Sequence, residues 1–186
     1  MKTEISFLFG ELFFAFIWIL IRAACWLKEK RIDWKREAVL LLIYVNLAVI
    51  IRFVFYPMEL QNGRIRPLIF DPEGLRTPKI NAIPFQNLFA YDIRRELLMN
   101  FFGNVVLFIP SGVILPAVYA KLGKFWKTAA AGAGISLAVE LLQLLFIERT
   151  TDIDDLIFNT LGVILGYGIY AVFRSIIKGR RKHIRG

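Results

Sequence analysis

The stretch TTDIDDLIFNTLGVILGYGIYAVF, residues 150–173, has three aspartates among its first six residues, carries an asparagine at position 159 and is otherwise mostly apolar. A segment of roughly 20 apolar residues is long enough to cross the hydrocarbon core of a bilayer as a helix. Polar groups at bilayer depth are costly, and they therefore tend to mark function. This stretch predicts a transmembrane helix whose first turns carry functional acids.

The composition of the whole chain agrees with a membrane protein. Of its 186 residues, 57% are hydrophobic and 15% aromatic, and the mean hydropathy is +0.56, which is unusual for a soluble domain. We expect an all-α polytopic bundle of about five transmembrane helices. Their expected ranges are 5–27, 37–56, 94–119, 125–147 and 153–173. The first range lacks the positive n-region and cleavage site of a signal peptide, so we expect it to be retained.

The distribution of basic residues predicts the orientation of these helices. The formal net charge of +9 would also suit nucleic acid, but the lysines and arginines lie in short loops and at the C-terminus, where they act as topology signals. The most basic connections are 28–36, 121–127 and 174–185, which we place in the cytoplasm. The N-terminus is then outside and the C-terminus inside, and no nucleic-acid partner is expected.

Four segments follow from this reading. Two N-terminal transmembrane helices occupy 1–56, and a proline-rich extracytoplasmic loop occupies 57–93. A core of three helices covers 94–173, and a basic cytoplasmic tail covers 174–186. A loop as long as 57–93 usually has a function or short structure of its own.

Cysteine and histidine are nearly absent, which limits the chemistry. Cys25 is alone, so no disulfide forms within one chain, and His183 lies in the tail. A Cys/His zinc site or a Ser–His triad cannot be assembled at the acidic cluster. Proton transfer there would fall to carboxylates, and a metal ion would need oxygen ligands, as Mg²⁺ prefers.

Polar residues recur at helical spacing on each of the last three expected helices, and residues spaced by three or four share a helix face. The members of these stripes are Glu96, Asn100 and Asn104; Ser136, Glu140 and Gln143; and Asp152, Asp155 and Asn159. The expected orientation puts all three stripes in the outer half of the bundle, so we expect them to meet in one pocket that opens to the exterior.

Structural roles are open alternatives for several of these residues. Thr151 or Asp152 is suited to cap the last helix, with Asp155 as its partner in a capping pair. The asparagines are suited to bond helix to helix. Glu140 lies within an apolar run, so its carboxylate must be paired, protonated or hydrated, and nearby arginines are possible partners.

Glycine and proline suggest close helix packing. Gly162 and Gly166 form a small-xxx-small pattern, which lets helix backbones approach each other. Pro110 and Pro116, with Gly103 and Gly112, could break or kink the helix expected at 94–119. A break there would expose carbonyl groups to a cavity.

At these residues the chain resembles the VanZ-like family. The resemblance is carried by NAIPF (81–85), NFFGNVVLFIPSGVILP (100–116), SLAVELLQLLF (136–146), Arg149 and DIDDLIFNTLGVILGY (152–167). It implies a multi-pass protein of the bacterial cytoplasmic membrane with a role in the cell envelope, in a family named for a protein associated with low-level teicoplanin resistance. It implies no reaction. The residues it marks are Asn81, Pro84, Asn104, Pro110, Glu140, Gln143, Arg149, Asp152, Asp154, Asp155 and Asn159.

Three functions fit the predicted site. In the first, the protein binds or remodels an outer-leaflet lipid or lipid-linked envelope component and so changes what glycopeptides such as teicoplanin can reach. Carboxylates would hold the hydroxyl- or amine-rich part, and arginines would hold phosphate. The expected binding residues are Asn81, Arg94, Arg95, Asn100, Asn104, Gln143, Arg149 and Asn159.

The second function is a metal-dependent enzyme that acts on a lipid phosphate or lipid-linked precursor. Asp152, Asp154 and Asp155 would hold a divalent cation such as Mg²⁺, and Glu140, Asp152 and Asp155 are the candidate catalytic residues. The nucleophile is not apparent. The third function is a lipid transporter or flippase with Glu140 as proton carrier, although the inner halves of the expected helices look apolar.

Overall fold

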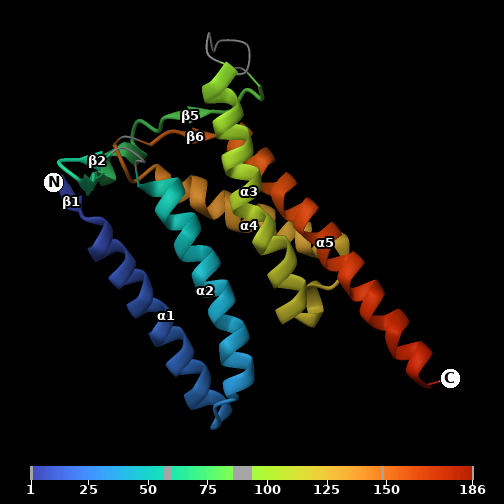
Figure 1. The fold of residues 1–186 in the computed structure, drawn as a ribbon. Helices are drawn as coiled ribbons and strands as arrows, with labels where there is room; N and C mark the ends of the chain where they lie inside the picture. The colour runs from blue at the N-terminus through green and yellow to red at the C-terminus, as the bar shows by residue number, and fades with distance from the viewer. Residues whose placement is uncertain (1, 57–59, 86–93, 148, 186) are drawn as a thin grey trace. The chain divides into compact units, whose positions relative to one another are not determined.

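The computed structural model describes residues 2–56, 60–85, 94–147 and 149–185. Of residues 61, 94–97 and 181–185 it describes the backbone and not the side chains. Helices dominate it, as predicted. They are α1 (Phe7–Glu29), α2 (Trp34–Phe55), α3 (Arg94–Val118), α4 (Phe125–Gln143) and α5 (Ile153–Arg185). Figure 1 shows them along the chain. Short 3-10 turns lie at Pro72–Leu75 and Ala120–Leu122.

Four of these helices are long and apolar enough to cross a membrane: α1, α2, the part of α3 from Leu98 to Val118, and the part of α5 from Ile153 to Arg180. Helix α4 is not one of these candidate membrane spans within the described residues. The sequence predicted a fourth helix to residue 147, but α4 ends at Gln143. After α4 the chain turns, and Ile147 donates its backbone N–H to the carbonyl oxygen of Ile69 at 3.1 Å.

The chain forms two compact units. The first contains Met1–Ile80 and Leu141–Thr151, and the second contains Asn81–Glu140 and Asp152–Gly186.

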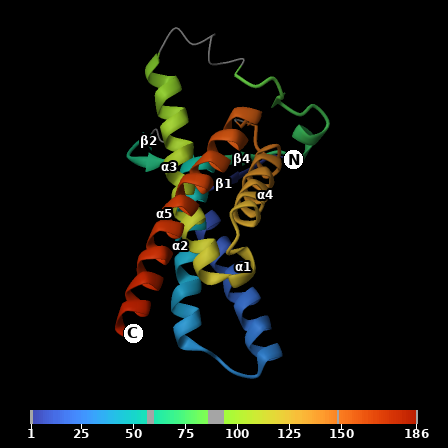
Figure 2. The same ribbon diagram turned by 90° about the vertical axis from the view of Figure 1, so that its right-hand side faces the viewer.

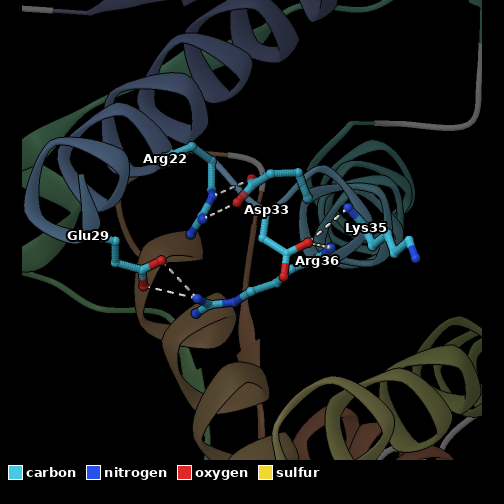
Figure 3. A network of polar contacts seen from close by, with 6 residues as sticks. Arg22, Glu29, Asp33, Lys35 and Arg36 are labelled. Carbon is cyan, nitrogen blue, oxygen red and sulfur yellow. Dashed lines mark hydrogen bonds and ion pairs between the residues drawn. The ribbon is translucent and has the colours of Figure 1, made fainter. Parts of the chain in front are cut away.

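In the first unit, α1 and α2 form an antiparallel hairpin (Figures 1 and 2). Helix α1 ends at Glu29, and Lys30 after it is left-handed with φ 52°. The side chain of Asp33 then caps α2 by accepting the N–H groups of Lys35 and Arg36 at 3.1 and 3.2 Å, and such a cap is worth about 0.5–2 kcal/mol. Figure 3 shows this turn, where Arg36 also reaches Glu29 at 2.9 Å.

The hairpin is held at the same end by a partly buried ion pair. Arg22 of α1 is 8% exposed, and its guanidinium donates two hydrogen bonds to the carboxylate of Glu37 in α2, at 2.8 and 2.5 Å. Further along the hairpin the rings of Phe14 and Tyr44 stack with 5.3 Å between centroids. A partly buried pair of this kind ties two apolar helices in one register, because either charge alone would be costly to bury.

Short strands complete the first unit. Strand β1 (Thr3–Ile5) pairs antiparallel with β4 (Leu68–Phe70), with Thr3 opposite Phe70 and Ile5 opposite Leu68. Strands β2 (Leu60–Gln61) and β3 (Arg64–Ile65) form a hairpin. Its turn residues Asn62 and Gly63 have φ values of 53° and 73°, as the favoured two-residue hairpin turn requires. The segment expected as a long loop therefore has structure of its own where it is described.

In the second unit, α3 lies along α5 (Figures 1 and 2). Glycines make this approach possible. A Cβ atom at Gly166 would lie 2.0 Å from the carbonyl oxygen of Ile109, and one at Gly162 would lie 2.2 Å from that of Val105. The small-xxx-small pattern thus packs α5 on α3. Helix α3 runs through Pro110 and Pro116 without a break, so the break considered from the sequence does not occur.

Helix α5 is longer than predicted. The sequence placed its end at residue 173, with a separate basic tail after it, but the helix continues to Arg185. The residues beyond 173 are rich in Lys and Arg, which are good helix formers, and they contain no proline.

Candidate functional site

The site lies in the second unit, where α5 begins. Strand β6 (Thr151–Asp152) precedes the helix, and Oδ1 of Asp152 accepts the backbone N–H of Asp154 at 2.9 Å. Asp152 is therefore the N-cap of α5, one of the structural roles left open by the sequence. Its own backbone N–H donates to Oε2 of Glu140 at 3.0 Å. The end of α4 is thus bound to the start of α5.

The NAIPF segment is held by the same acids. Asn81, at the end of β5 (Ile80–Asn81), donates from Nδ2 to Oδ2 of Asp152 at 3.0 Å. The backbone N–H of Phe85 donates to Oδ1 of Asp154 at 2.8 Å. Asp154 is 4% exposed. Asp152 and Asp154 therefore fix this segment against the first turn of α5.

Phe85 itself has an uncommon backbone conformation, with φ 61°. A bulky residue in the left-handed region is strained by about 1–3 kcal/mol and persists only where its surroundings hold it. The bond to Asp154 supplies part of that hold, and the Phe85 ring lies 6.5 Å from that of Phe158. The ring is nevertheless 42% exposed, so a strained aromatic residue is presented at the surface of this unit.

Asp155 forms a separate cluster with two amides of α3. Its Oδ1 accepts from Nδ2 of Asn104 at 2.6 Å, and the same Nδ2 donates to Oδ1 of Asn100 at 2.8 Å. Asp155 and Asn104 are half-buried, whereas Asn100 is exposed. This acid–amide cluster, defined as Asp155, Asn104 and Asn100, thus runs from the α3–α5 contact to the surface of the unit.

Glu140 and Asn159 are buried more deeply, each 1% exposed. Asn159 donates from Nδ2 to Oγ of Ser136 at 2.9 Å, which is the helix-to-helix bond considered from the sequence. Its Oδ1 has no hydrogen-bond partner among the described residues. The three predicted polar stripes are thus bonded to one another at several points in this unit.

Gln143 and Arg149 are placed in the first unit. Nε2 of Gln143 donates to the carbonyl oxygen of Val54 at 3.3 Å, and Nε of Arg149 donates to that of Phe55 at 2.8 Å. A second bond joins Nη2 of Arg149 to the same oxygen. These carbonyls end α2, so both side chains satisfy groups that a helix leaves without intrahelical partners. No local sequence signal indicated this role.

The remaining residues predicted for the site make none of the side-chain contacts described above. Arg94 and Arg95 begin α3, but their side chains and that of Glu96 lie outside the described part of the chain. Pro84 is exposed, next to Phe85.

The acids show no metal-ligand arrangement. Within the residues that the structure describes, no group of three or more His, Cys, Asp or Glu side chains is placed to hold a metal ion. Both oxygens of Asp152 and one oxygen of Asp154 accept N–H groups. The Mg²⁺ site predicted at Asp152, Asp154 and Asp155 gains no support from these contacts.

The long apolar helices define a multi-pass membrane protein. The family model described as VanZ/LLP1 matches residues 38–174, and the chain belongs to this family. It is 38% identical over 69 residues to Protein VanZ of Enterococcus faecium. That alignment covers 37% of this chain and 42% of the relative. No solved structure matched the chain.

Proposed function

We propose that this protein binds an outer-leaflet lipid or a lipid-linked component of the cell envelope at the acid–amide cluster. The observation that carries the proposal is the hydrogen bond between Asp155 and Asn104, which also bonds Asn100, within two helices of membrane-spanning length. The outer-leaflet assignment rests on the predicted orientation.

The hydrogen-bond partners of the three aspartates support a binding role for this cluster rather than for its neighbours. Asp152 and Asp154 are used in capping α5 and in holding residues 81–85. Asp155 instead bonds to amides that lead to the exposed Asn100. A carboxylate with amides recognises hydroxyl or amine groups, which are common in lipid headgroups and in lipid-linked sugars and peptides.

Phosphate recognition is a further part of the proposal. Arg94 and Arg95 precede Asn100 on α3 by one to two helical turns. Guanidinium groups bind phosphate with two parallel hydrogen bonds. Binding of such a component would change what glycopeptides reach outside the membrane, and teicoplanin susceptibility is the phenotype in which we expect this to show.

The test compares envelope lipids, with their leaflet distribution, in a deletion strain and in strains that express Asp155→Asn or Tyr167→Phe at the wild-type level. Asp155→Asn keeps the shape but removes the charge. Tyr167→Phe is the matched control, because it removes a hydrogen bond to the carbonyl oxygen of Gly123 elsewhere in the same unit. We expect the deletion and Asp155→Asn to alter the same lipid species and Tyr167→Phe to have no effect.

The result also separates the alternatives. A new covalent form of a lipid in wild-type cells that disappears with Asp155→Asn would indicate an enzyme. Altered leaflet distribution alone, without any lipid retained by the purified protein, would indicate a transporter. An unchanged lipid profile in both the deletion and the Asp155→Asn strain would contradict the proposal.

A further inference from the structure

A second feature lies in the first unit and is independent of the acid–amide cluster. An apolar groove of about 500 Å³ lies between α1, α2, β4 and the end of α4. Phenylalanines form much of its wall: Phe9, Phe13, Phe14, Phe55, Phe70 and Phe146. Its size is within the range of roughly 300–1,000 Å³ that is typical of small-molecule sites.

The groove is built by contacts between distant parts of the chain. The ring of Phe146 meets those of Phe55 and Phe70 edge-on, at 5.7 and 6.0 Å between centroids. Among the described residues that line the groove, Tyr56 alone has a polar side chain. Its hydroxyl group donates to the carbonyl oxygen of Ser6 at 3.3 Å. The groove therefore suits a hydrocarbon chain and offers little to a polar group.

A polar pocket adjoins this groove. The two share Ile5 and Phe9 as lining residues, and the polar pocket adds Arg64 and Arg66, with Glu4 opposing their charge. Arg64 is held by the β2–β3 hairpin, opposite Gln61. Figure 1 shows β1 and β2 near the N-terminal end of α1. A pocket lined by two guanidinium groups thus lies next to the apolar groove.

We propose that this pair of pockets binds one acyl chain of an anionic phospholipid, with the lipid phosphate at Arg64 and Arg66. Charge complementarity selects the occupant, because arginine binds phosphate through bidentate hydrogen bonds. Location supports it as well. Helix α1 is apolar and largely exposed in this structure, with Phe9 61% and Phe13 57% exposed, so lipid chains are the molecules that meet this face in a bilayer.

The test uses native mass spectrometry of the full-length protein in detergent, titrated with phosphatidylglycerol or with diacylglycerol, which lacks the phosphate. Arg64→Gln removes one guanidinium from an exposed strand residue, and Arg31→Gln is the matched control at the exposed α1–α2 turn. We expect Arg64→Gln to weaken phosphatidylglycerol binding about tenfold or more, since a lost charge-assisted bond has at least that effect. Diacylglycerol binding should not change.

A second pair of variants tests the groove. Leu142→Trp places a large ring at a lining residue that is 51% exposed, whereas Leu12→Trp adds the same ring on α1 at a residue 60% exposed that does not line the groove. Leu142→Trp should reduce binding of both lipids, and Leu12→Trp should leave it unchanged. Retention of phosphatidylglycerol at wild-type strength in both Arg64→Gln and Leu142→Trp would overturn the proposal.

Two further outcomes are decisive. A lipid-free dimer that Leu142→Trp abolishes would show that a second copy of the chain fills the groove, which also overturns the proposal. Tyr167→Phe removes a hydrogen bond in the second unit, away from both proposed sites, and should bind phosphatidylglycerol like the wild type. Arg64→Gln and Leu142→Trp should leave the effect of Asp155 on the envelope phenotype intact, so that failure of the groove and failure of the acid–amide cluster are distinguishable.

Discussion

At the scale of single residues, neighbouring acids at the start of α5 have different tasks. Asp152 caps the helix and also holds Asn81, Asp154 holds the backbone of Phe85, and Asp155 contacts Asn104. These positions are adjacent in sequence, but the helix turns them toward different partners. Substitutions should therefore separate structural from binding effects.

Asp154→Ala should release the backbone N–H of Phe85 and let residues 81–85 open. A buried hydrogen bond to a charged acceptor contributes about 1.5–3 kcal/mol, so amide hydrogen exchange at Phe85 should accelerate by a factor of ten or more. Asp154→Asn keeps an acceptor oxygen and should restore much of the protection. Equal exchange in Asp154→Ala and wild type would show that this bond does not hold the segment.

Arg149→Gln should lower stability through the end of α2. The guanidinium donates two hydrogen bonds to the carbonyl oxygen of Phe55. The glutamine side chain is shorter, so we do not expect it to replace both bonds. A partly buried carbonyl group that loses its donors costs about 1–3 kcal/mol, to be measured by denaturant unfolding in detergent. Arg31→Gln, at an exposed position, should change stability little. Loss of envelope function without loss of stability would instead support the phosphate-binding role expected from the sequence.

At the scale of elements, the contact between α3 and α5 decides whether the acid–amide cluster can form. Asn100 and Asn104 lie on one helix and Asp155 on the other, so the cluster depends on how closely the helices approach. Glycines allow the short distance between the helices. A Cβ atom added at Gly112 would lie 2.1 Å from the carbonyl oxygen of Val163. The packing of helices in membranes commonly relies on such small residues.

Gly166→Ala should therefore push α5 away from α3. The added Cβ would lie 2.0 Å from a backbone oxygen, and backbone cannot yield as a flexible side chain does. Overpacking of this kind costs about 1–3 kcal/mol, which thermal unfolding in detergent would show. Gly168→Ala is the matched control on the same helix, because a Cβ atom added there would have no described neighbour within 4 Å. Equal melting of the two variants would contradict the close contact.

At the scale of the whole molecule, the orientation of the protein in the membrane determines in which leaflet the acid–amide cluster lies. The distribution of lysine and arginine predicts that residues 121–127 face the cytoplasm and residues 57–93 the exterior. The four apolar helices are compatible with a multi-pass protein, and the side of each loop remains a prediction.

Cysteine labelling tests that prediction. In a Cys25→Ala background, Arg76→Cys should react with a membrane-impermeant maleimide added to intact cells, and Lys121→Cys should react after lysis alone. Both positions are exposed, so accessibility reports the side of the membrane. Labelling of Lys121→Cys in intact cells, with Arg76→Cys protected, would reverse the orientation and with it the proposed leaflet.

Hydropathy and periodicity in the sequence determined much of this protein. They predicted the all-α membrane class and most helix limits to within a few residues. They also placed Asn100, Asn104 and Asp155 on helix faces that could meet. The spacing of residues along the sequence is enough to determine which of them share a helix face.

Tertiary structure decided which distant groups the polar side chains bind, whereas the capping role of Asp152 is local. Arg149 binds the carbonyl of a residue 94 positions away, and Asp154 binds one 69 positions away, so neither role leaves a local pattern. Helix α4 ends at Gln143, where the following residues bond to β4 and the segment after it. Spacing along the chain reports which residues share a face, whereas hydrogen-bond partners depend on contacts that form only when distant segments pack.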